Sequence, residues 1–198
     1  MKGSSTAAAR GVVREVPSAL ALPLDARDAA APGDWEAVYR AHAPAVARWA
    51  ARLAGPAEDV EDLVQEVFLV VQARLPEFRG EGKLTTWLYR ITVNVVRGQR
   101  RRNRLRRWLG LAPAEEPEAP GLAPDEQASA RQALATVYRA LEALSERDRR
   151  VLILHELEGL TGPEIAELEA ITPSAVWVRL HRARKRFASR VAALEGRR

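Results

Sequence analysis

The highest density of charged side chains in this 198-residue chain lies in a tract of arginines, QRRRNRLRR, inside the segment 97–107. Seven of the eleven residues of that segment are arginine. Guanidinium groups held so close repel one another, and binding to a polyanion relieves the repulsion by releasing counterions. The tract therefore predicts a nucleic-acid contact. A membrane surface is the less favoured polyanion, because no strongly apolar face accompanies the arginines.

A second basic segment begins after Thr172, a predicted N-cap that Pro173 follows at the first helical position. A short helical segment, 163–168, precedes it across a tight connection. A short helix, a turn and a longer basic helix are typical of a helix-turn-helix, whose second helix lies in the major groove. A helical hairpin with a solvated basic face has the same periodicity and remains the alternative.

The helical repeat sorts the side chains of this second helix into an apolar stripe and an outer face. The predicted stripe is formed by Val176, Leu180, Ala183 and Phe187. The residues predicted to lie nearest the base edges are Ser174, Trp177, Val178 and His181. The residues predicted mainly to contact phosphates are Arg179, Arg182 and Arg184. A tryptophan and a valine among the base-facing residues favour thymine methyl groups over guanine acceptors.

Acidic residues crowd the start of the segment 60–75, whose apolar residues have the clearest helical spacing in the chain. They are Glu58, Asp59, Glu61 and Asp62, and Gln65 and Glu66 follow. Acidic residues interact favourably with the macrodipole at a helix N-terminus, which explains this composition without any partner. The functional interpretation is an acidic surface that docks a basic partner helix.

The next predicted helix, from Leu84 onward, carries aromatic, amide and basic side chains around an apolar stripe. They are Thr85, Thr86, Trp87, Tyr89, Arg90, Asn94 and Arg97. Aromatic rings beside arginine and amide groups can stack bases and bind phosphates in single-stranded nucleic acid. The alternative is that the rings belong to the core, and the spacing of Trp87 from Leu84 and Leu88 favours a mostly buried ring.

The familiar catalytic patterns are missing from the sequence. HELEG is not the HExxH of metalloproteases, and GEGKL lacks the first glycine and the Ser/Thr of a phosphate-binding loop. His42, His155 and His181 are too far apart for a local zinc motif, and the chain has no cysteine. No serine nucleophile elbow occurs. We therefore expect no enzymatic activity, no metal, no cofactor and no small-molecule substrate.

The elements that position these residues are all predicted to be helical. Apolar residues recur at helical spacing, and no strand-like alternation of useful length occurs. The predicted fold is all-α, with two small helical domains and a helix-turn-helix in the second. The predicted boundaries are a disordered N-terminal extension at 1–33, domains at 34–108 and 128–198, and a flexible linker at 109–127.

The sequence also bears on the compartment. No apolar run approaches the ~18–20 residues that span a bilayer, and no sustained apolar core of a signal peptide follows the N-terminus. We therefore expect a cytoplasmic protein without membrane insertion.

Two stretches resemble the extracytoplasmic-function (ECF) group of bacterial sigma factors. DVEDLVQEVFLVV and LPEFRGEGKLTTWLYRITVNVVRGQRRR are similar to region two of that family. LSERDRRVLILHELEGLTGPEIAELEAI and VRLHRARKRF are similar to region four, in the family's order and spacing. The specific motifs are DLVQEVF and TWLYRI. The resemblance implies a dissociable RNA polymerase subunit that selects promoters.

The resemblance also implies roles for residues of the first domain. The clamp coiled coil of the largest core subunit would be docked by Asp62, Gln65, Glu66 and Phe68. The minus-ten element would be captured and opened by Phe78, Arg79, Trp87, Tyr89, Arg90, Asn94, Arg97 and Arg101. Opening requires a base to unstack, and a pocket with stacking and amide groups recovers that cost.

The second domain would read the minus-thirty-five element as duplex and rest an apolar surface on the flap of the second-largest subunit. The chain departs from the family pattern at the turn, where Ala170 stands in place of a common glycine and Glu169 in place of an apolar residue. Alanine adopts a positive φ at a cost of ~1 kcal/mol, so we expect a reshaped turn. Trp177 and Val178 also replace a basic residue and a serine, so the family's minus-thirty-five preference is not expected to carry over. The alternative is that Trp177 faces protein.

The partners implied by the resemblance are core RNA polymerase, promoter DNA and an anti-sigma factor. The alternative function is a stand-alone helix-turn-helix regulator, whose first domain binds a protein or dimerises. The DLVQEVF segment distinguishes the two, because a regulator has no need for a polymerase-docking surface.

Overall fold

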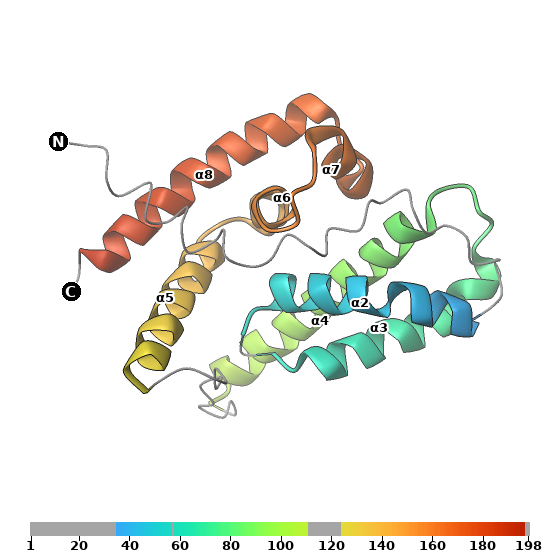
Figure 1. The fold of residues 1–198 in the computed structure, drawn as a ribbon, viewed down its shortest axis with the longest axis horizontal. Helices are drawn as coiled ribbons and strands as arrows, with labels where there is room; N and C mark the ends of the chain where they lie inside the picture. The colour runs from blue at the N-terminus through green and yellow to red at the C-terminus, as the bar shows by residue number, and fades with distance from the viewer. Residues whose placement is uncertain (1–34, 57, 111–123, 197–198) are drawn as a thin grey trace. The chain divides into compact units, whose positions relative to one another are not determined.

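The computed structural model of the protein describes residues 35–56, 58–110 and 124–196. Every regular element in these ranges is helical, which confirms the predicted all-α class. The described helices fall into two compact units, α2 to α4 and α5 to α8 (Figure 1). The predicted extension 1–33 and most of the predicted linker 109–127 lie outside the described residues.

The first unit consists of α2 (Trp35–Ala54), α3 (Val60–Arg74), a 3-10 turn η2 (Leu75–Glu77) and α4 (Leu84–Trp108). Each α-helix packs against the other two and contributes an apolar stripe to one core. The largest fully buried side chains of this core are Val38, Val46, Leu63, Val67, Val71, Leu88 and Tyr89. Burial of these stripes, at roughly 25 cal/mol per Å² of apolar surface, is what holds three separate helices together.

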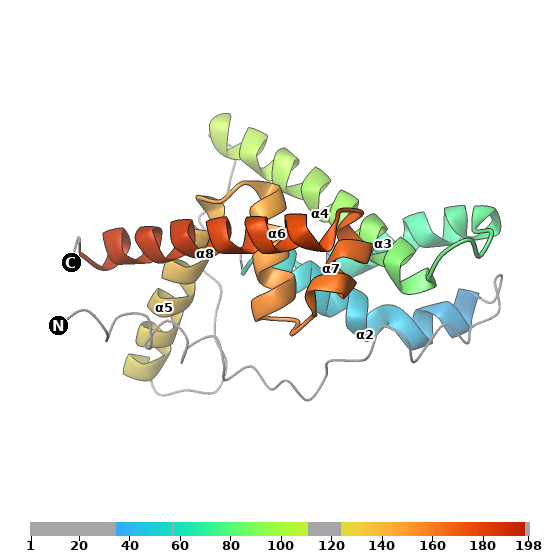
Figure 2. The same ribbon diagram turned by 90° about the horizontal axis from the view of Figure 1, so that it is seen from above.

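Local signals set the ends of these helices. Gly55 follows α2 with φ 97°, a left-handed conformation that costs glycine little and ends the helix. Asp59 caps α3, and η2 follows α3 with Pro76 near its start. α4 has 25 residues and no acidic residue in its sequence. Its C-terminal end stands clear of α2 and α3 (Figure 2).

The second unit consists of α5 (Pro124–Glu142), α6 (Glu146–Glu156), α7 (Gly162–Glu169) and α8 (Pro173–Glu195). α8 packs against the other three helices, so it forms the spine of the unit. α5 begins at Pro124, before the predicted domain boundary at residue 128; proline is favoured at the first turn of a helix. The best-buried core residues are Val151, Leu154, Ile165, Leu168, Val176, Leu180 and Ala183.

Candidate functional site

The acidic cluster at the start of α3 has partly local roles. The Asp59 side chain accepts hydrogen bonds from the backbone N–H groups of Glu61 and Asp62, at 2.9 and 3.2 Å. The Glu58 carboxylate accepts the side-chain amide of Asn103 at 2.7 Å to each oxygen. Helix capping and this contact therefore account for two of the acidic side chains, while Asp62 is exposed on the surface.

We define the α3 outer face as Asp62, Gln65, Glu66 and Leu69, which recur at intervals of three and four residues. Asp62 and Gln65 are exposed, and the Glu66 carboxylate accepts hydrogen bonds from Nη2 of Arg102 at 2.8 and 3.1 Å. Leu69 is 66 % exposed. It was missed by the sequence analysis, although its spacing from Asp62 and Gln65 was the signal that could have found it.

Phe68 does not belong to the α3 outer face. Its side chain is 3 % exposed, and its ring packs edge-on against Trp35 and Tyr39, with centroids 5.7 and 4.7 Å apart. Phe68 follows Val67 on the apolar stripe of α3, so the helical repeat turns it toward α2. The predicted docking role of Phe68 is therefore corrected to a core role that supports the surface residues.

Two aromatic side chains meet at the start of α4. Phe78, in the loop before the helix, and Trp87 are both half-buried, with ring centroids 5.2 Å apart. Arg79 is exposed beside them in sequence. The partial burial of Trp87 agrees with its predicted position at the edge of the apolar stripe, and it leaves part of each ring open to solvent.

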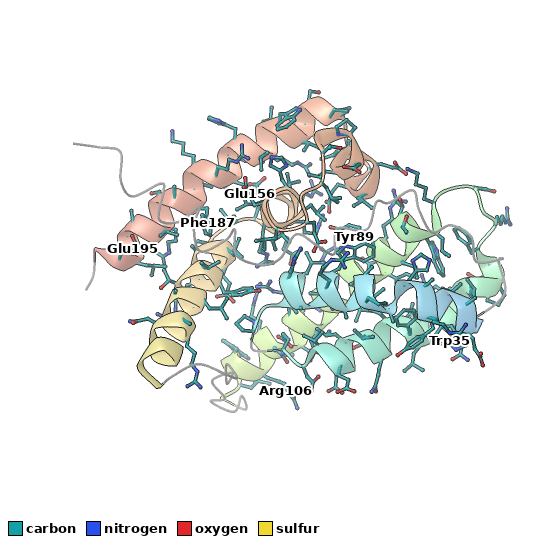
Figure 3. All side chains as sticks on the ribbon, in the orientation of Figure 1. Trp35, Tyr89, Arg106, Glu156, Phe187 and Glu195 are labelled. Carbon is teal, nitrogen blue, oxygen red and sulfur yellow. The ribbon has the colours of Figure 1, made fainter. Side chains whose placement is uncertain are left out.

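Tyr89 is placed differently from its predicted role. Its side chain, labelled in Figure 3, is 1 % exposed. The ring packs edge-on against Trp49 of α2 at 5.4 Å between centroids. Thr85 and Thr86 are buried as well. A ring in this position cannot stack on a base without leaving the core. Tyr89 is therefore corrected from a DNA contact to a core residue that fixes the rotation of α4.

The side of α4 that faces away from the core carries Arg90, Asn94, Arg97 and Arg101, all of them exposed. Their spacing of four, three and four residues places them on one line along the helix. We call these four residues the α4 outer face. The structure thus brings four of the predicted minus-ten residues together on a single surface.

The arginine tract also contacts the protein itself. Arg100 donates to the backbone carbonyl of Leu53 at 2.9 Å, and Arg102 bonds Glu66 as described above. Together with Asn103 and Glu58, these contacts tie the second half of α4 to the end of α2 and the start of α3. The tract is therefore divided between an inner side that anchors the helix and the α4 outer face.

The turn between α7 and α8 keeps its tight geometry despite Ala170. Ala170 adopts the left-handed conformation, φ 52° and ψ 51°, and its N–H is directed at the carbonyls of Ala166 and Glu167. The Glu169 side chain is 3 % exposed, and Arg150 of α6 donates to both of its oxygens at 2.8 and 2.6 Å. The expected reshaping does not occur, because Ala170 itself adopts the left-handed conformation, and a bidentate ion pair satisfies the buried Glu169 carboxylate beside it.

Helix α8 presents the predicted base-facing residues on its surface. Ser174, Trp177, Val178 and His181 are all exposed, and the Thr172 hydroxyl caps the helix by accepting from the Ala175 N–H at 3.2 Å. Val176, Leu180 and Ala183 are buried as expected, whereas Phe187 is only half-buried. The helix-turn-helix pattern of the sequence is therefore present with its outer face accessible.

The Trp177 side chain is partly packed against the protein and partly open to solvent. Its side chain is 50 % exposed, and its ring meets His155 edge-on at 5.7 Å between centroids. A β-carbon on Gly162 would lie 3.1 Å from the indole, so the absence of a side chain at this position of α7 leaves room for the ring. One side of Trp177 therefore braces α7 against α8, and the other remains open.

Two arginines predicted to contact phosphates are held by carboxylates of α6. Arg182 donates to both oxygens of Asp148 at 3.1 and 2.7 Å, and Arg184 donates to Glu156 at 2.7 Å. Burial alone would raise the pKa of Asp148, but hydrogen bonds from Arg182 and Ser145 and the nearby positive charges hold it below its ordinary 3.8. The Asp148 carboxylate in turn raises the pKa of Arg182. Arg182 is thus a structural cation because Asp148 is buried, whereas the Arg184–Glu156 pair is exposed on both sides, at 50 % and 39 %, and contributes little stability.

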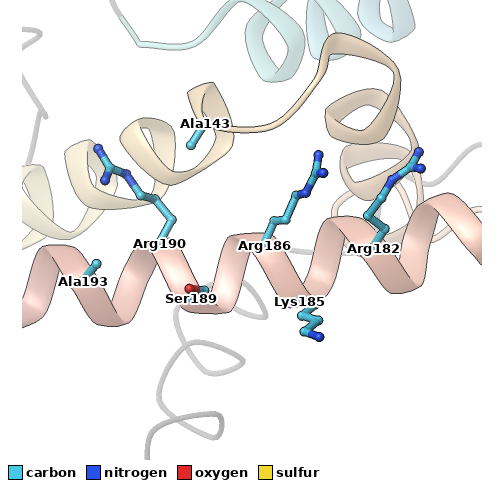
Figure 4. A pocket seen from close by; sticks show the side chains of 7 residues that line it. All are labelled: Ala143, Arg182, Lys185, Arg186, Ser189, Arg190 and Ala193. Atoms are coloured by element: carbon cyan, nitrogen blue, oxygen red, sulfur yellow. The ribbon is translucent and has the colours of Figure 1, made fainter.

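A basic groove of about 550 Å³ lies along α8, beside Ala143 in the connection after α5 (Figure 4). Its lining residues are Ala143, Arg182, Lys185, Arg186, Ser189, Arg190 and Ala193. Arg186 lies 3.8 Å from Asp148, and Lys185 and Arg190 are exposed. The arginine and lysine side chains that line this groove make this part of the unit's surface positively charged.

Within the described ranges, no group of three or more His, Asp or Glu side chains is arranged to hold a metal ion. No helix of that part of the chain combines the length and apolar character needed to cross a bilayer.

Comparisons with known proteins match both units. Residues 38–106 match the family model described as Sigma-70 region 2, and residues 134–187 match the model described as Sigma-70, region 4. The chain is 32 % identical over 166 residues to the RNA polymerase sigma factor NccH of Alcaligenes xylosoxydans xylosoxydans, covering 80 % of this chain and 88 % of NccH. It is 33 % identical over 150 residues to the ECF RNA polymerase sigma-E factor of Escherichia coli K12, covering 70 % of this chain and 77 % of that protein.

The fold is also similar to a solved structure, the sigma factor RpoE in complex with the anti-sigma factor NepR from Bartonella quintana. The TM-score is 0.56 at 24 % identity, and the match covers 80 % of this chain and 96 % of the other. At this identity the likeness establishes the arrangement of helices.

Proposed function

The chain belongs to the extracytoplasmic-function group of RNA polymerase sigma factors, and we propose that its two units divide the work of that family between them. A sigma factor binds core RNA polymerase and directs initiation at the promoters that it recognises. The α2–α4 unit docks the core enzyme and opens the minus-ten element, and the α5–α8 unit reads the minus-thirty-five element. The observation that carries this proposal is the pair of outer faces on the first unit, acidic on α3 and basic on α4.

Core docking is assigned to the α3 outer face. Asp62 and Gln65 are exposed and Leu69 adds an apolar contact among polar groups, which is the composition of a docking surface for a basic coiled coil. The Glu66–Arg102 pair is exposed on both sides, at 42 % and 53 %, so it contributes little stability and can exchange for a partner's cation.

Minus-ten capture is assigned to the loop before α4 and to the α4 outer face. The half-buried pair Phe78 and Trp87 offers aromatic surface for an unstacked base, and Asn94 offers an amide that can donate and accept. Arg90, Arg97 and Arg101 supply the charge that holds the backbone. Tyr89 acts from the core by keeping this face turned outward.

Minus-thirty-five recognition is assigned to the first turns of α8. Ser174, Val178 and His181 are exposed there, and the open side of Trp177 lies on the same face. Val178 and Trp177 favour thymine methyl groups, and Arg179 supplies a phosphate contact. Arg182 is left out of this assignment because it binds the buried Asp148, whereas Arg184 can exchange its exposed contact with Glu156 for a phosphate.

The proposal extends to partners and compartment. The second unit rests on the flap of the second-largest polymerase subunit, and an anti-sigma factor controls the protein, as NepR binds the similar RpoE of Bartonella quintana. The protein acts in the cytoplasm, where the polymerase is, as a binding subunit that catalyses no reaction of its own and needs no cofactor.

The test is reconstitution from purified components. The full chain is mixed with core polymerase and a library of duplex templates that is randomised around the minus-ten and minus-thirty-five positions, and the transcripts are sequenced. We expect transcripts that start at a fixed distance from a shared motif, and none of these from core polymerase alone. DNA binding without core polymerase and without such transcripts would instead support a stand-alone regulator.

A charge reversal separates core docking from folding in the same assay. Asp62→Arg is expected to weaken binding to core polymerase by about 2 kcal/mol, roughly thirtyfold, because it places a cation against a basic partner. Glu36→Arg is the matched control, since Glu36 is an exposed acidic residue of α2 in the same unit. Equal affinity of both variants in a fluorescence titration contradicts the α3 assignment.

A further inference from the structure

Trp108 at the end of α4 is the most exposed of the large apolar side chains in the described part of the chain, at 81 %. Burying an aromatic ring of this size is strongly favourable, and an open one beside arginines commonly marks a contact surface. No role for Trp108 was predicted from the sequence.

The helical repeat relates Trp108 to the α4 outer face. At about 100° per residue, Arg90, Asn94, Arg97, Arg101, Arg104 and Trp108 all lie within roughly 40° of one line along the helix. Arg104 and Trp108 are exposed, like the four residues before them. The line from Arg90 to Trp108 is 18 residues long, about 27 Å. The α4 outer face therefore continues past Arg101 for nearly two turns.

The neighbouring side chains of the tract are turned elsewhere. Arg100 reaches the carbonyl of Leu53, and Arg102 reaches Glu66. Arg106 is exposed but lies about 160° from the line by the same repeat. Arg101 and Arg104 make no ion pair with another described residue. The outward cations and the aromatic ring thus share one side of the helix, which is the arrangement that a long polyanion contacts.

We propose that Arg104 and Trp108 bind the backbone of duplex DNA upstream of the opened minus-ten element. The proposal rests on the proposed function of α4. Arg104 pairs with a phosphate, while the indole N–H of Trp108 donates to a phosphate oxygen and its ring covers the adjacent sugar. Such contacts fix the position of the helix on DNA without reading sequence.

Duplex rather than single-stranded DNA follows from distance. The aromatic pair proposed to hold an unstacked base includes Trp87, and Trp108 lies 21 residues further along the same rigid helix. That separation is about 31 Å, or roughly nine base-pair steps. Trp108 is also the end of α4 from which the chain continues to the α5–α8 unit, which is proposed to read the minus-thirty-five element upstream. On that upstream side the DNA is still paired, and its two phosphate strands match the charge of Arg101 and Arg104.

The experiment uses holoenzyme made from the full chain and core polymerase, with a template chosen by the reconstitution described above. Two versions of the template are opened over the minus-ten element in advance. One keeps a long upstream duplex, and the other is cut back to a few base pairs upstream of the opening. Affinity is measured by fluorescence anisotropy over a range of salt concentrations for Arg104→Ala, Trp108→Ala, Trp108→Phe and the matched control Arg106→Ala.

We expect Arg104→Ala and Trp108→Ala each to weaken binding to the long template about fivefold, and to leave the short template within about twofold of wild type. Arg104→Ala also lowers the salt slope by about 0.9, and Trp108→Ala leaves the slope unchanged. Trp108→Phe retains most of the affinity. Arg106→Ala, which removes the same charge on the other side of the helix, stays within about twofold of wild type on both templates.

Equal losses on both templates, or a loss with Arg106→Ala as large as with Arg104→Ala, overturn the proposal. These results are distinct from failure of the proposed function, in which wild-type holoenzyme selects no template and binds neither version. Circular dichroism melting of each variant shows whether the fold is intact.

Discussion

The two longest helices of the described chain, α4 and α8, both carry many arginines, but the guanidinium groups have different partners. On α8, Arg182 and Arg184 bind Asp148 and Glu156 of the neighbouring α6. On α4, Arg102 binds Glu66, while Arg101 faces away from the unit. The number of arginines on a helix therefore says little about its contact with DNA. The carboxylates on the elements packed against it decide how many cations are left for a ligand.

The strength of these pairs differs for a physical reason. The Asp148 side chain is 2 % exposed, and a buried carboxylate is costly unless a cation stays with it. Arg182 is therefore committed to Asp148. Glu66 is 42 % exposed and loses little when Arg102 leaves, because water replaces the cation. Helix α8 thus commits Arg182 to holding its unit together, and α4 keeps most of its outer cations available.

The largest expected effect tests what turns the α4 outer face outward. Tyr89→Ala removes a ring that is 1 % exposed and packs on Trp49, so we expect a loss of about 3–5 kcal/mol in the free energy of unfolding. Tyr89→Phe keeps the ring and is expected to cost less than about 1.5 kcal/mol. Urea denaturation of the full chain measures both. If the alanine variant is as stable as the wild type but fails to open promoters, Tyr89 contacts DNA and the core assignment is wrong.

The next effect tests the structural role of the α8 arginines. Asp148→Asn removes the charge that holds Arg182 and Arg186. We expect the free energy of unfolding to fall by about 1–2 kcal/mol at neutral pH, a value kept small by the partial exposure of Arg182. Because the folded-state pKa of Asp148 lies below its ordinary 3.8, the extra stability of the wild type over the variant is complete above pH 3.8. It is lost as the pH falls through the folded-state pKa. Urea denaturation at a series of pH values measures it, and an advantage that persists at the lowest pH contradicts this account.

A smaller effect compares the two helices directly. Arg101→Ala on α4 removes an outward cation, and we expect the slope of log affinity against log salt for holoenzyme and promoter duplex to fall by about 0.9. Arg182→Ala on α8 removes a cation that is committed to the buried Asp148, and we expect little change in the slope. Equal changes in the two variants would show that the ion pairs of α8 open when DNA binds, and the distinction between the helices would be lost.

The smallest effect concerns the turn before α8. Ala170 has a positive φ, which costs an alanine about 1 kcal/mol and a glycine almost nothing. Ala170→Gly is expected to stabilise the protein by about 0.5 kcal/mol, since the greater freedom of glycine in the unfolded chain offsets part of the gain. Differential thermal melting of the two proteins measures this. A destabilised glycine variant would mean that the methyl group of Ala170 makes a contact that outweighs the strain.

Much of the candidate site was predictable because its signals are local. The exposure of Asp62, Gln65 and Asn94 follows from the 3.6-residue repeat, since each lies off the apolar stripe of its own helix. The caps of α3 and α8 at Asp59 and Thr172 follow from the residue types that accept backbone N–H groups. Such features depend on residues within a turn of one another.

The two misplaced residues differ in their signals. Phe68 lies on the apolar stripe of α3, so the helical repeat favours its burial, and only the family resemblance assigned it to the surface. Tyr89 lies where the repeat of α4 alone allows either a buried or an exposed ring. Which one occurs depends on the neighbouring helix, and here Trp35 and Tyr39 receive Phe68 while Trp49 receives Tyr89. Periodicity in one helix carries no information about the residues that another helix brings against it.

By itself, then, the sequence determined the helical class, the helix caps and the membership of the sigma-factor family. Helix formation and family motifs depend on residues that lie close together in the sequence. The tertiary structure decided which cations are committed. Arg102 lies 36 residues from Glu66, and Arg182 lies 34 residues from Asp148, so neither pair can be derived from local spacing. The availability of a charge for DNA is set by packing between helices, which only the folded chain contains.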